Sequence, residues 1–474
     1  MKAHSINKGI SPRVIIAGIR GGAGKTTVSL GVIAALAKRG LNVVPFKKGP
    51  DYIDAGWLSS AAGRDCYNLD PFMISDRNII SSFRTHFDAA DLAVIEGNRG
   101  LFDGMDAEGT FSTAELAKIL NAPVILVMDC TKVTRTAAAM LFGMVRFDPK
   151  VKIAGVVLNQ IAGRRHETVI RESVAKYCRV PVVGAIPKLK GEQLSERHMG
   201  LTPFQEHPGV KDAISICRET AEKYLDLDAI LEVARSAPAL RSFGVDSFST
   251  HHPLPITHHG LRIGIIRDSA FQFYYPENFE ALQKRGAEII EISALTEKKI
   301  PDIDALYIGG GFPETHAIAL AKNRSFRNSL KNAVESGLPV YAECGGLMYL
   351  GTALMLGKKR YEMTGVFPFV FGLEKRPQAH GYTIIKVSAV NPYYRRGITL
   401  KGHEFHYSKV VNQEECRETD FSFSSERGGG IIDGRDGACY KNVLATYTHL
   451  HALGSPEWAD GMLKQAIKYR RSRR

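Results

Sequence analysis

The sequence has no long apolar run. Its most apolar segment, residues 123–128, is the length of a strand, whereas a membrane-spanning helix needs roughly 18 apolar residues. Residues 1–12 also contain no apolar stretch of the kind found in signal peptides. These absences predict a protein that works in the cytoplasm and does not enter a membrane.

Closely spaced cysteine pairs are absent as well. The seven cysteines are scattered along the 474 residues, are odd in number and form no Cys-x-x-Cys pair. This pattern argues against a disulfide framework and against a zinc site. We expect most of them to be small buried hydrophobic residues, as for Cys130, whereas Cys344 stands in a different context.

Acidic residues are outnumbered, with 49 Asp and Glu against 62 Lys and Arg, and the formal net charge is +13. A basic balance suggests an acidic partner, which is a nucleic acid, a membrane surface or a polyanionic small molecule. No basic stretch is interleaved with aromatic residues as in single-strand binders, so we expect no nucleic acid and no membrane partner. Part of the excess charge lies at residues 470–474, which we expect to be a solvated helix end.

The first half of the chain alternates between short apolar strands and helices. Residues 26–39 carry apolar side chains at helical spacing and are followed by Gly40. Such alternation favours a parallel sheet covered by helices. The strands expected in this half are residues 14–18, 42–46, 92–95, 123–128 and 153–158.

A change in composition separates the two halves. Residues 238–260 contain prolines and four closely spaced histidines without periodicity, and we interpret them as a polar linker rather than a metal site. The predicted architecture is α/β, with two doubly wound domains at residues 12–237 and 261–465. In the second domain we expect strands at 262–266, 288–292, 305–308 and 339–342 and a helix around 278–285.

A glycine-rich segment follows the first predicted strand and opens the first predicted helix. It runs from Gly18 through Gly22 and Gly24 to Lys25, Thr26 and Thr27. Glycines let backbone N–H groups surround phosphate oxygens, and the helix N-terminus adds its dipole. In such a phosphate-binding loop (P-loop) the lysine binds the β- and γ-phosphates and the first threonine hydroxyl can bind Mg²⁺. Five residues separate Gly18 from Gly24, one more than in the usual pattern.

Four acids lie just beyond the ends of predicted strands in this domain. Asp51 and Asp54 follow the second strand, Glu96 ends the next, and Asp103 comes shortly after it. The carboxyl ends of parallel strands form the ligand-binding edge of such a sheet. We predict that Thr26, Asp54 and Glu96 hold Mg²⁺, and that Asp51 and Asp103 take part in catalysis.

In the second half, Cys344 lies where a predicted strand turns into a Gly-Gly pair. This resembles a nucleophile elbow, with Ala342 in place of the first glycine. A cysteine at a helix N-terminus is expected to have a lowered thiol pKa. The segment Tyr447–His451 offers His449 and His451 as bases, and residues 309–314 can supply oxyanion-hole N–H groups.

These motifs together resemble a known family. One half is similar to dethiobiotin-synthetase-like P-loop amidoligases, which share the five-residue insert, and the other to class I glutamine amidotransferases. Their order resembles the cobyrinic acid a,c-diamide synthase family over roughly residues 12–465. The shared motifs are GKTT at 24–27, Lys47 with GPDYID at 49–54, EG at 96–97, LFDG at 101–104, AECGGLMYL at 342–350, GHEFHYS at 402–408 and YTHLH at 447–451.

The resemblance implies a mechanism. ATP and Mg²⁺ bind the P-loop half, where Gly22, Gly24, Lys25, Thr26, Thr27 and Lys47 form the nucleotide site. A carboxylate of a tetrapyrrole polycarboxylate becomes an acyl phosphate, and Cys344 with His449 as base releases ammonia from L-glutamine. The implied reaction is amidation of the a and c carboxylates of cobyrinic acid, and the oligomeric state stays open, with a homodimer as one alternative.

Some residues depart from the expected pattern. Triad glutamine amidotransferases usually carry Glu two residues after the catalytic histidine, but His451 holds that position, as in the corrinoid-type branch. Three residues next to the expected substrate mouth also differ from the pattern expected of the family, namely Lys48, Ala55 and Trp57. They leave open a sirohaem or nickel-sirohydrochlorin ring as the substrate.

Two other classes of protein fit only part of the sequence. A P-loop partitioning-type ATPase would carry a signature lysine where this chain has Arg20, and it would have no use for a glutaminase half. A pseudoenzyme would not need an intact Cys344 and His449.

Overall fold

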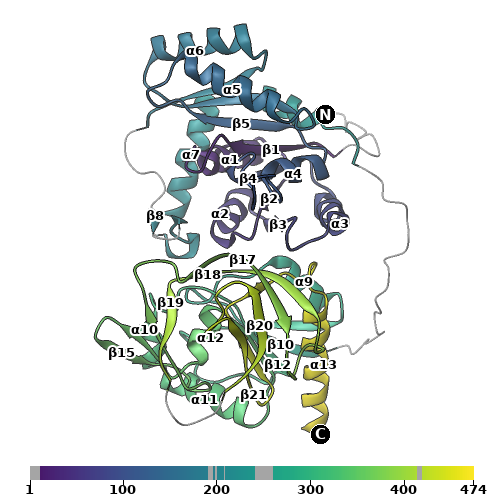
Figure 1. The fold of residues 1–474 in the computed structure, drawn as a ribbon, viewed down its shortest axis with the longest axis vertical. Helices are drawn as coiled ribbons and strands as arrows, with labels where there is room; N and C mark the ends of the chain where they lie inside the picture. The colour runs from purple at the N-terminus through teal and green to yellow at the C-terminus, as the bar shows by residue number, and fades with distance from the viewer. Residues whose placement is uncertain are drawn as a thin grey trace. The chain divides into compact units, whose positions relative to one another are not determined.

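The computed structural model describes residues 11–189, 196–197, 200–207, 209–240, 260–413 and 419–473. The chain divides into two compact units, residues 1–248 and 249–474 (Figure 1). Most of the predicted linker, with its four histidines, lies at 241–259, outside the described residues. No described helix is long and apolar enough to cross a membrane.

The N-terminal unit is built on a seven-stranded sheet in the order β3-β2-β4-β1-β5-β6-β7. All neighbouring strands are parallel. Because helices cover both faces of such a sheet, its strands are continuous apolar runs rather than alternating ones. The strands are β1 (Arg13–Gly18), β2 (Val43–Lys48), β3 (Tyr67–Leu69), β4 (Leu92–Gly100), β5 (Val124–Asp129), β6 (Ile153–Ile161) and β7 (Val182–Pro187).

Eight helices are described in this unit. Side-chain caps set where several begin: Asp51 caps α2, Ser75 caps α3 and Asp226 caps α8, each accepting from a backbone N–H in the first turn. The helices are α1 (Lys25–Lys38), α2 (Tyr52–Ala62), α3 (Asp76–Phe87), α4 (Thr113–Ile119), α5 (Arg135–Phe147), α6 (Arg164–Tyr177), α7 (Val210–Tyr224) and α8 (Leu227–Arg235). The short elements β8 (Glu196–Arg197), β9 (Gly200–Leu201) and η1 (Phe204–Glu206) lie between β7 and α7.

Trp57 and Ala55 belong to the core of this unit. Trp57 is fully buried, and its indole N–H donates to the carbonyl oxygen of Thr202 at 2.9 Å. Ala55 is 6% exposed, and both residues pack in the cluster beneath α1 and α2. The expectation that they flank the substrate mouth is therefore wrong, because both side chains pack in the core against neighbouring helices.

The C-terminal unit contains a ten-stranded mixed sheet. Its parallel part has the order β11-β10-β12-β13-β22, with strands β10 (Leu261–Ile266), β11 (Ala287–Ile292), β12 (Ala305–Ile308), β13 (Val340–Glu343) and β22 (Val443–Thr446). The sheet then continues with five antiparallel strands, β21 (Arg435–Tyr440), β20 (Asp420–Arg427), β17 (Ala379–Val387), β18 (Thr399–His406) and β23 (His449–Leu450). The predicted α/β fold is confirmed in both units, while the antiparallel extension was not foreseen from the sequence.

A smaller sheet and five described helices complete this unit. The sheet has the order β15-β14-β16-β19, with strands β14 (Ala353–Leu356), β15 (Lys359–Glu362), β16 (Phe369–Leu373) and β19 (Ser408–Gln413). The helices are α9 (Pro276–Gln283), α10 (Ala317–Lys322), α11 (Arg324–Glu335), α12 (Gly345–Leu350) and α13 (Glu457–Ser472), the last drawn in yellow in Figure 1.

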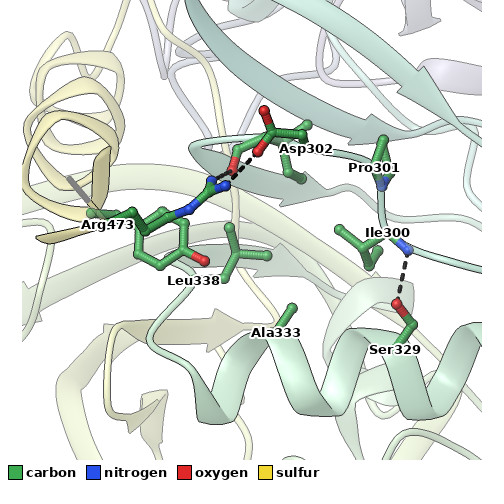
Figure 2. A pocket seen from close by; sticks show the side chains of 9 residues that line it. Ile300, Pro301, Asp302, Ser329, Ala333, Leu338 and Arg473 are labelled. Atoms are coloured by element: carbon green, nitrogen blue, oxygen red, sulfur yellow. Dashed lines mark hydrogen bonds and ion pairs between the residues drawn. The ribbon is translucent and has the colours of Figure 1, made fainter. Parts of the chain in front are cut away.

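The sequence suggested a solvated helix end at the basic end of α13, but two of its arginines pair with aspartates. Arg470 donates from Nε to Asp304 Oδ1 at 2.9 Å, and Arg473 donates to Asp302 Oδ1 at 2.6 Å. A cavity of about 290 Å³ lies beside the Arg473–Asp302 pair, lined also by Ser329 and Leu338 (Figure 2). None of its lining residues belongs to the predicted sites. The two arginine–aspartate pairs join the end of α13 to the segment just before β12.

Candidate active sites

The P-loop lies between β1 and α1, as the sequence predicted. Gly22 and Gly24 have φ values of 69° and 95°, in the left-handed region that glycine adopts without strain. The Lys25 side chain folds back over Gly18, where a Cβ atom would lie 3.1 Å from Lys25 Cγ. The loop therefore makes the tight turns that a phosphate-binding loop at a helix N-terminus needs.

Asn159, at the end region of β6, supports this loop, and the sequence analysis did not single it out. Its Nδ2 donates to the carbonyl oxygen of Ala23 at 2.9 Å. A Cβ atom at Gly24 would lie 2.2 Å from the same nitrogen, so only glycine fits there. Asn159 is distant in sequence from the loop, and no local motif marks it.

Three of the predicted site residues meet around the Lys47 ammonium group. Lys47 Nζ lies 2.7 Å from Asp54 Oδ2 and 2.8 Å from Glu96 Oε1. The Thr26 hydroxyl donates to the same Glu96 oxygen at 2.9 Å. Glu96 lies inside β4 rather than at its end, because β4 continues to Gly100 and pairs Glu96 with Lys47 of β2. The tertiary fold thus brings Thr26, Lys47, Asp54 and Glu96 into one cluster.

The charges in this cluster are strongly coupled. Although burial opposes it, the carboxylates of Asp54 and Glu96 raise the pKa of Lys47, so its ammonium stays charged. Burial opposes ionisation of Asp54 too, but Lys47 outweighs it and lowers the pKa of Asp54. Burial lowers the pKa of Lys25 below its ordinary value, although Glu96 opposes this shift. The negative charge of a phosphate group bound at the loop would favour the protonated form of Lys25.

Asp51 and Asp103 each bind backbone N–H groups. Asp51 Oδ1 accepts from Ile53 and Asp54, at 2.8 and 2.9 Å, and so caps α2. Asp103 Oδ2 accepts from the Gly100 N–H at 2.8 Å. Burial and the neighbouring Asp54 raise the pKa of Asp51 to about 7, within the range suited to proton transfer. Their catalytic roles stay predictions, and the contacts show how both carboxylates are held in place.

A divalent cation fits the donors of this cluster. Glu96 Oε2 is buried and has no hydrogen-bond partner among the described residues, and the Thr26 hydroxyl lies beside the other oxygen. The described residues contain no group of three or more His, Cys, Asp or Glu side chains that would cage a metal alone. Mg²⁺ typically uses one or two carboxylates together with water and phosphate oxygens, so the donor set suits that ion.

Cys344 forms the elbow between β13 and α12. Its φ of 47° and ψ of −100° lie in the strained region typical of a nucleophile on a sharp turn. The expectation of a lowered thiol pKa is wrong: burial, followed by the nearby Glu314 carboxylate, raises the pKa of the Cys344 thiol well above its ordinary value. The thiol is therefore protonated in the resting enzyme and needs a base.

The predicted glycine run contacts both sides of this elbow. The Gly346 N–H donates to the Gly309 carbonyl oxygen at 3.1 Å. A Cβ atom at Gly310 would lie 2.5 Å from His449 Cε1 and 3.1 Å from His449 Nε2. A Cβ atom at Gly345 would lie 3.0 Å from the Gly311 backbone nitrogen. The glycine run thus packs against both the cysteine turn and the His449 ring.

His449 and His451 face different partners. His449 Nδ1 lies 3.2 Å from Glu343 Oε2, whereas His451 Nε2 lies 3.5 Å from Glu277 Oε1. The His403 ring, from the GHEFHYS motif, stacks on His449 with a centroid distance of 5.0 Å. Burial holds the pKa of His403 well below its ordinary value, and His449 adds to the shift, so this neighbouring ring is neutral.

Glu343 was not predicted from the sequence as a partner of the histidine. The available signal was an acid at the end of an otherwise apolar strand, directly before the nucleophile. Only the pairing of β13 with β22 shows that this acid meets the segment containing His449.

Comparison with known proteins agrees with this geometry. Residues 14–201 match the "CobQ/CobB/MinD/ParA nucleotide binding domain" and residues 262–457 the "CobB/CobQ-like glutamine amidotransferase domain". The cobyrinate a,c-diamide synthase of Magnetococcus marinus is 41% identical over 94% of this chain and 96% of its own length. The chain belongs to the cobyrinate a,c-diamide synthase family. The family resemblance predicted from the motifs is confirmed.

Other relatives cover similar shares of the chain. Proteins called cobyrinate a,c-diamide synthase from Archaeoglobus fulgidus and Listeria innocua are 42% and 40% identical, over 96% and 94% of this chain and 98% and 97% of their own lengths. A solved structure described as a glutamine amidotransferase covers 43% of this chain and 98% of its own length at 19% identity, with a TM-score of 0.33. Membership of the synthase family excludes the partitioning-type ATPase alternative, because that alternative has no glutamine amidotransferase half.

The contact between Gly310 and His449 leads to a test. Gly310→Ala is expected to displace the His449 ring and to lower the rate of glutamine hydrolysis by about 10²-fold, within the range for loss of a positioned base. The measurement is glutamate release from glutamine. Gly143→Ala, in α5, is the matched control because a Cβ there meets nothing within 4 Å. An unchanged rate in Gly310→Ala would show that the ring is not constrained by this glycine.

Proposed function

We propose that this protein uses ATP and glutamine to amidate the a and c carboxylates of cobyrinic acid. The observation that carries the proposal is the presence, in one chain of this family, of a nucleotide cluster around Lys47 and, in the other unit, a Cys344 elbow together with a buried His449 paired with Glu343. An isolated nucleotide site would support ATP hydrolysis only, and an isolated elbow only glutamine hydrolysis. The two sites in one chain fit a glutamine-dependent ligase.

The ligase half-reaction begins at the P-loop. A carboxylate is a poor electrophile, so its oxygen first attacks the γ-phosphorus of ATP, the bond to the bridging oxygen breaks, and ADP leaves. Ammonia then attacks the acyl carbon of the acyl phosphate, inorganic phosphate leaves, and the nitrogen loses a proton to give the carboxamide. Lys25 and the N–H groups of the loop hold the phosphates, and Asp51 is placed to exchange a proton near neutral pH.

Thr26, Asp54 and Glu96 would hold the Mg²⁺ ion of this half-reaction. When bound, the ion supplies neutralisation of the phosphate charge. Lys47 has a separate task, because its ammonium keeps the Asp54 carboxylate ionised in a buried place. The unpartnered Oε2 atom of Glu96 supports this assignment.

The glutaminase half-reaction uses Cys344 and His449. His449 accepts the thiol proton, and the thiolate attacks the side-chain amide carbon of glutamine. His449 then protonates the departing nitrogen, ammonia leaves, and a thioester remains on Cys344. Water hydrolyses the thioester, which gives glutamate and the free thiol. We expect backbone N–H groups of the glycine run to stabilise the oxyanion.

The choice of ring rests on the relatives and on the corrected position of two residues. The relatives named above are cobyrinate a,c-diamide synthases. Ala55 and Trp57 suggested a different tetrapyrrole only while they were placed at a substrate mouth, and both are core residues. The net charge of +13 supports a polycarboxylate substrate. A cytoplasmic location is part of the proposal, because Cys344 must stay a reduced thiol.

The substrate is tested directly. Purified enzyme with ATP, Mg²⁺ and glutamine is expected to convert cobyrinic acid to a diamide. Each amidation replaces a carboxyl OH with NH₂, so mass spectrometry counts the amides formed. Sirohaem and nickel-sirohydrochlorin serve as comparison substrates. Turnover of either ring without turnover of cobyrinic acid would overturn the substrate while leaving the family intact.

The separation of the two chemistries is tested at the nucleophile. Cys344→Ser is expected to abolish amidation with glutamine, because a serine hydroxyl in this site is a far weaker nucleophile than a thiolate. High ammonium concentrations should restore amidation, since the P-loop half uses ammonia itself. The measurement is diamide formation with each nitrogen source. Failure of ammonium to restore it would show that Cys344 has a role beyond ammonia release.

The role of Glu96 is tested by removing its charge. Glu96→Gln is expected to lower ammonium-dependent amidation by about 10²-fold or more, as when one electrostatic group is lost from a charged transition state. Glutamate release from glutamine should persist. Glu115→Gln, which changes a surface acid paired with Lys118, is the control. Near-normal amidation by Glu96→Gln would exclude Glu96 from the metal site.

A further inference from the structure

We infer that Glu343 is the positioning carboxylate of the glutaminase histidine, in place of the acid that usually follows that histidine by two residues. This inference rests on the proposed glutamine hydrolysis at Cys344. Glu343 directly precedes the nucleophile, at the end of β13, and is fully buried. The usual position of the acid is held by His451.

Glu343 binds both the ring and the backbone of the histidine segment. Its Oε2 atom lies 3.2 Å from His449 Nδ1, and its Oε1 atom accepts from the Leu450 N–H at 3.2 Å. The Tyr307 hydroxyl, from β12, donates to Oε2 at 2.9 Å. A carboxylate with these three contacts fixes where the His449 ring lies and how it is rotated, and the hydrogen bonds offset the loss of hydration on burial.

The contact also sets the tautomer of His449. An ionised carboxylate only accepts hydrogen bonds, so Nδ1 must carry the proton and Nε2 is left as the acceptor. The Nε2 side of the ring faces Gly310, in the glycine run that contacts the Cys344 turn. In the proposed mechanism this unprotonated Nε2 takes the thiol proton, and Glu343 stabilises the imidazolium that forms.

His451 does not fill this role. Its Nδ1 atom accepts from the Leu453 N–H at 3.2 Å, and its Nε2 atom faces Glu277. Glu277 and His451 thus form a second buried glutamate–histidine pair in the unit that contains Glu343 and His449. That second pair provides a matched control for the first.

Titratable groups near His449 include residues of three neighbouring strands. Glu343 lies on β13 and contacts the ring. Tyr307 on β12 is linked to the ring by its hydrogen bond to Glu343. His403 on β18 stacks on the ring and is neutral. Among these groups, Glu343 is the one placed to bind the Nδ1 proton.

The test is Glu343→Gln in the full-length enzyme. The glutamine keeps the shape and the acceptor for Leu450, but its NH₂ group faces Nδ1 and moves the ring proton to Nε2. The expected result is a fall of about 10³- to 10⁴-fold in kcat for glutamine hydrolysis, as when a triad acid becomes an amide, with KM little changed. Amidation with ammonium is expected to be retained, which shows that the protein is folded.

The tautomer is measured directly, because a merely structural role would not change it. In protein carrying ¹⁵N-labelled histidine, the His449 signals are assigned by their loss in His449→Ala. They are expected to report an Nδ1 proton in the natural enzyme and an Nε2 proton in Glu343→Gln. Glu277→Gln, the matched control, is expected to leave both the His449 tautomer and kcat unchanged.

Each outcome has a clear meaning. If the natural enzyme releases no glutamate from glutamine, the proposed function fails. If it does so and Glu343→Gln keeps kcat and the Nδ1 proton, this inference fails. If Glu343→Gln does not fold, Tyr307→Phe decides: loss of its hydroxyl should lower kcat without changing KM, and an unchanged kcat would overturn the inference.

Discussion

The burial of charge at the carboxyl ends of parallel strands is the constraint on which both sites depend. In the N-terminal unit, the Lys47 ammonium lies between Asp54 and Glu96 beneath the nucleotide loop. Removing one partner of such a buried group typically destabilises a protein by about 3–5 kcal/mol, because the remaining charge is left unpaired. The cluster therefore holds its carboxylates in place before any nucleotide arrives.

In the C-terminal unit, a buried carboxylate is paired with a histidine instead of a lysine. A fully buried carboxylate, Glu343, lies 3.2 Å from the imidazole of His449, which takes up and releases a proton in the proposed mechanism. Burial raises the pKa of the Cys344 thiol, so the proposed mechanism needs a base to form the thiolate. Close contacts between the glycine run and the His449 ring make this arrangement intolerant of added side-chain atoms.

Much of the chemistry could be predicted from the sequence, because it is local. The P-loop from Gly18 to Thr27 and the elbow at Cys344 are continuous segments whose conformation follows from glycine placement beside an apolar strand. The main parallel strands were also predictable within a few residues, since strands buried on both faces are continuous apolar runs. The family followed from the order of these local motifs along the chain.

Other features depended on the tertiary structure because they join distant segments. Asn159 reaches the P-loop from β6, and Glu343 reaches His449 across the β13–β22 pairing. Burial also decided two features that residue type alone left open. It raised the pKa of the Cys344 thiol, whereas a position at a helix N-terminus had suggested a lowered pKa. Trp57, expected near the substrate, is buried in the core. The sequence by itself determined the family and indicated the candidate catalytic groups, whereas the packing of strands determined their partners and their protonation, because desolvation and pairing depend on neighbours that are remote in the chain.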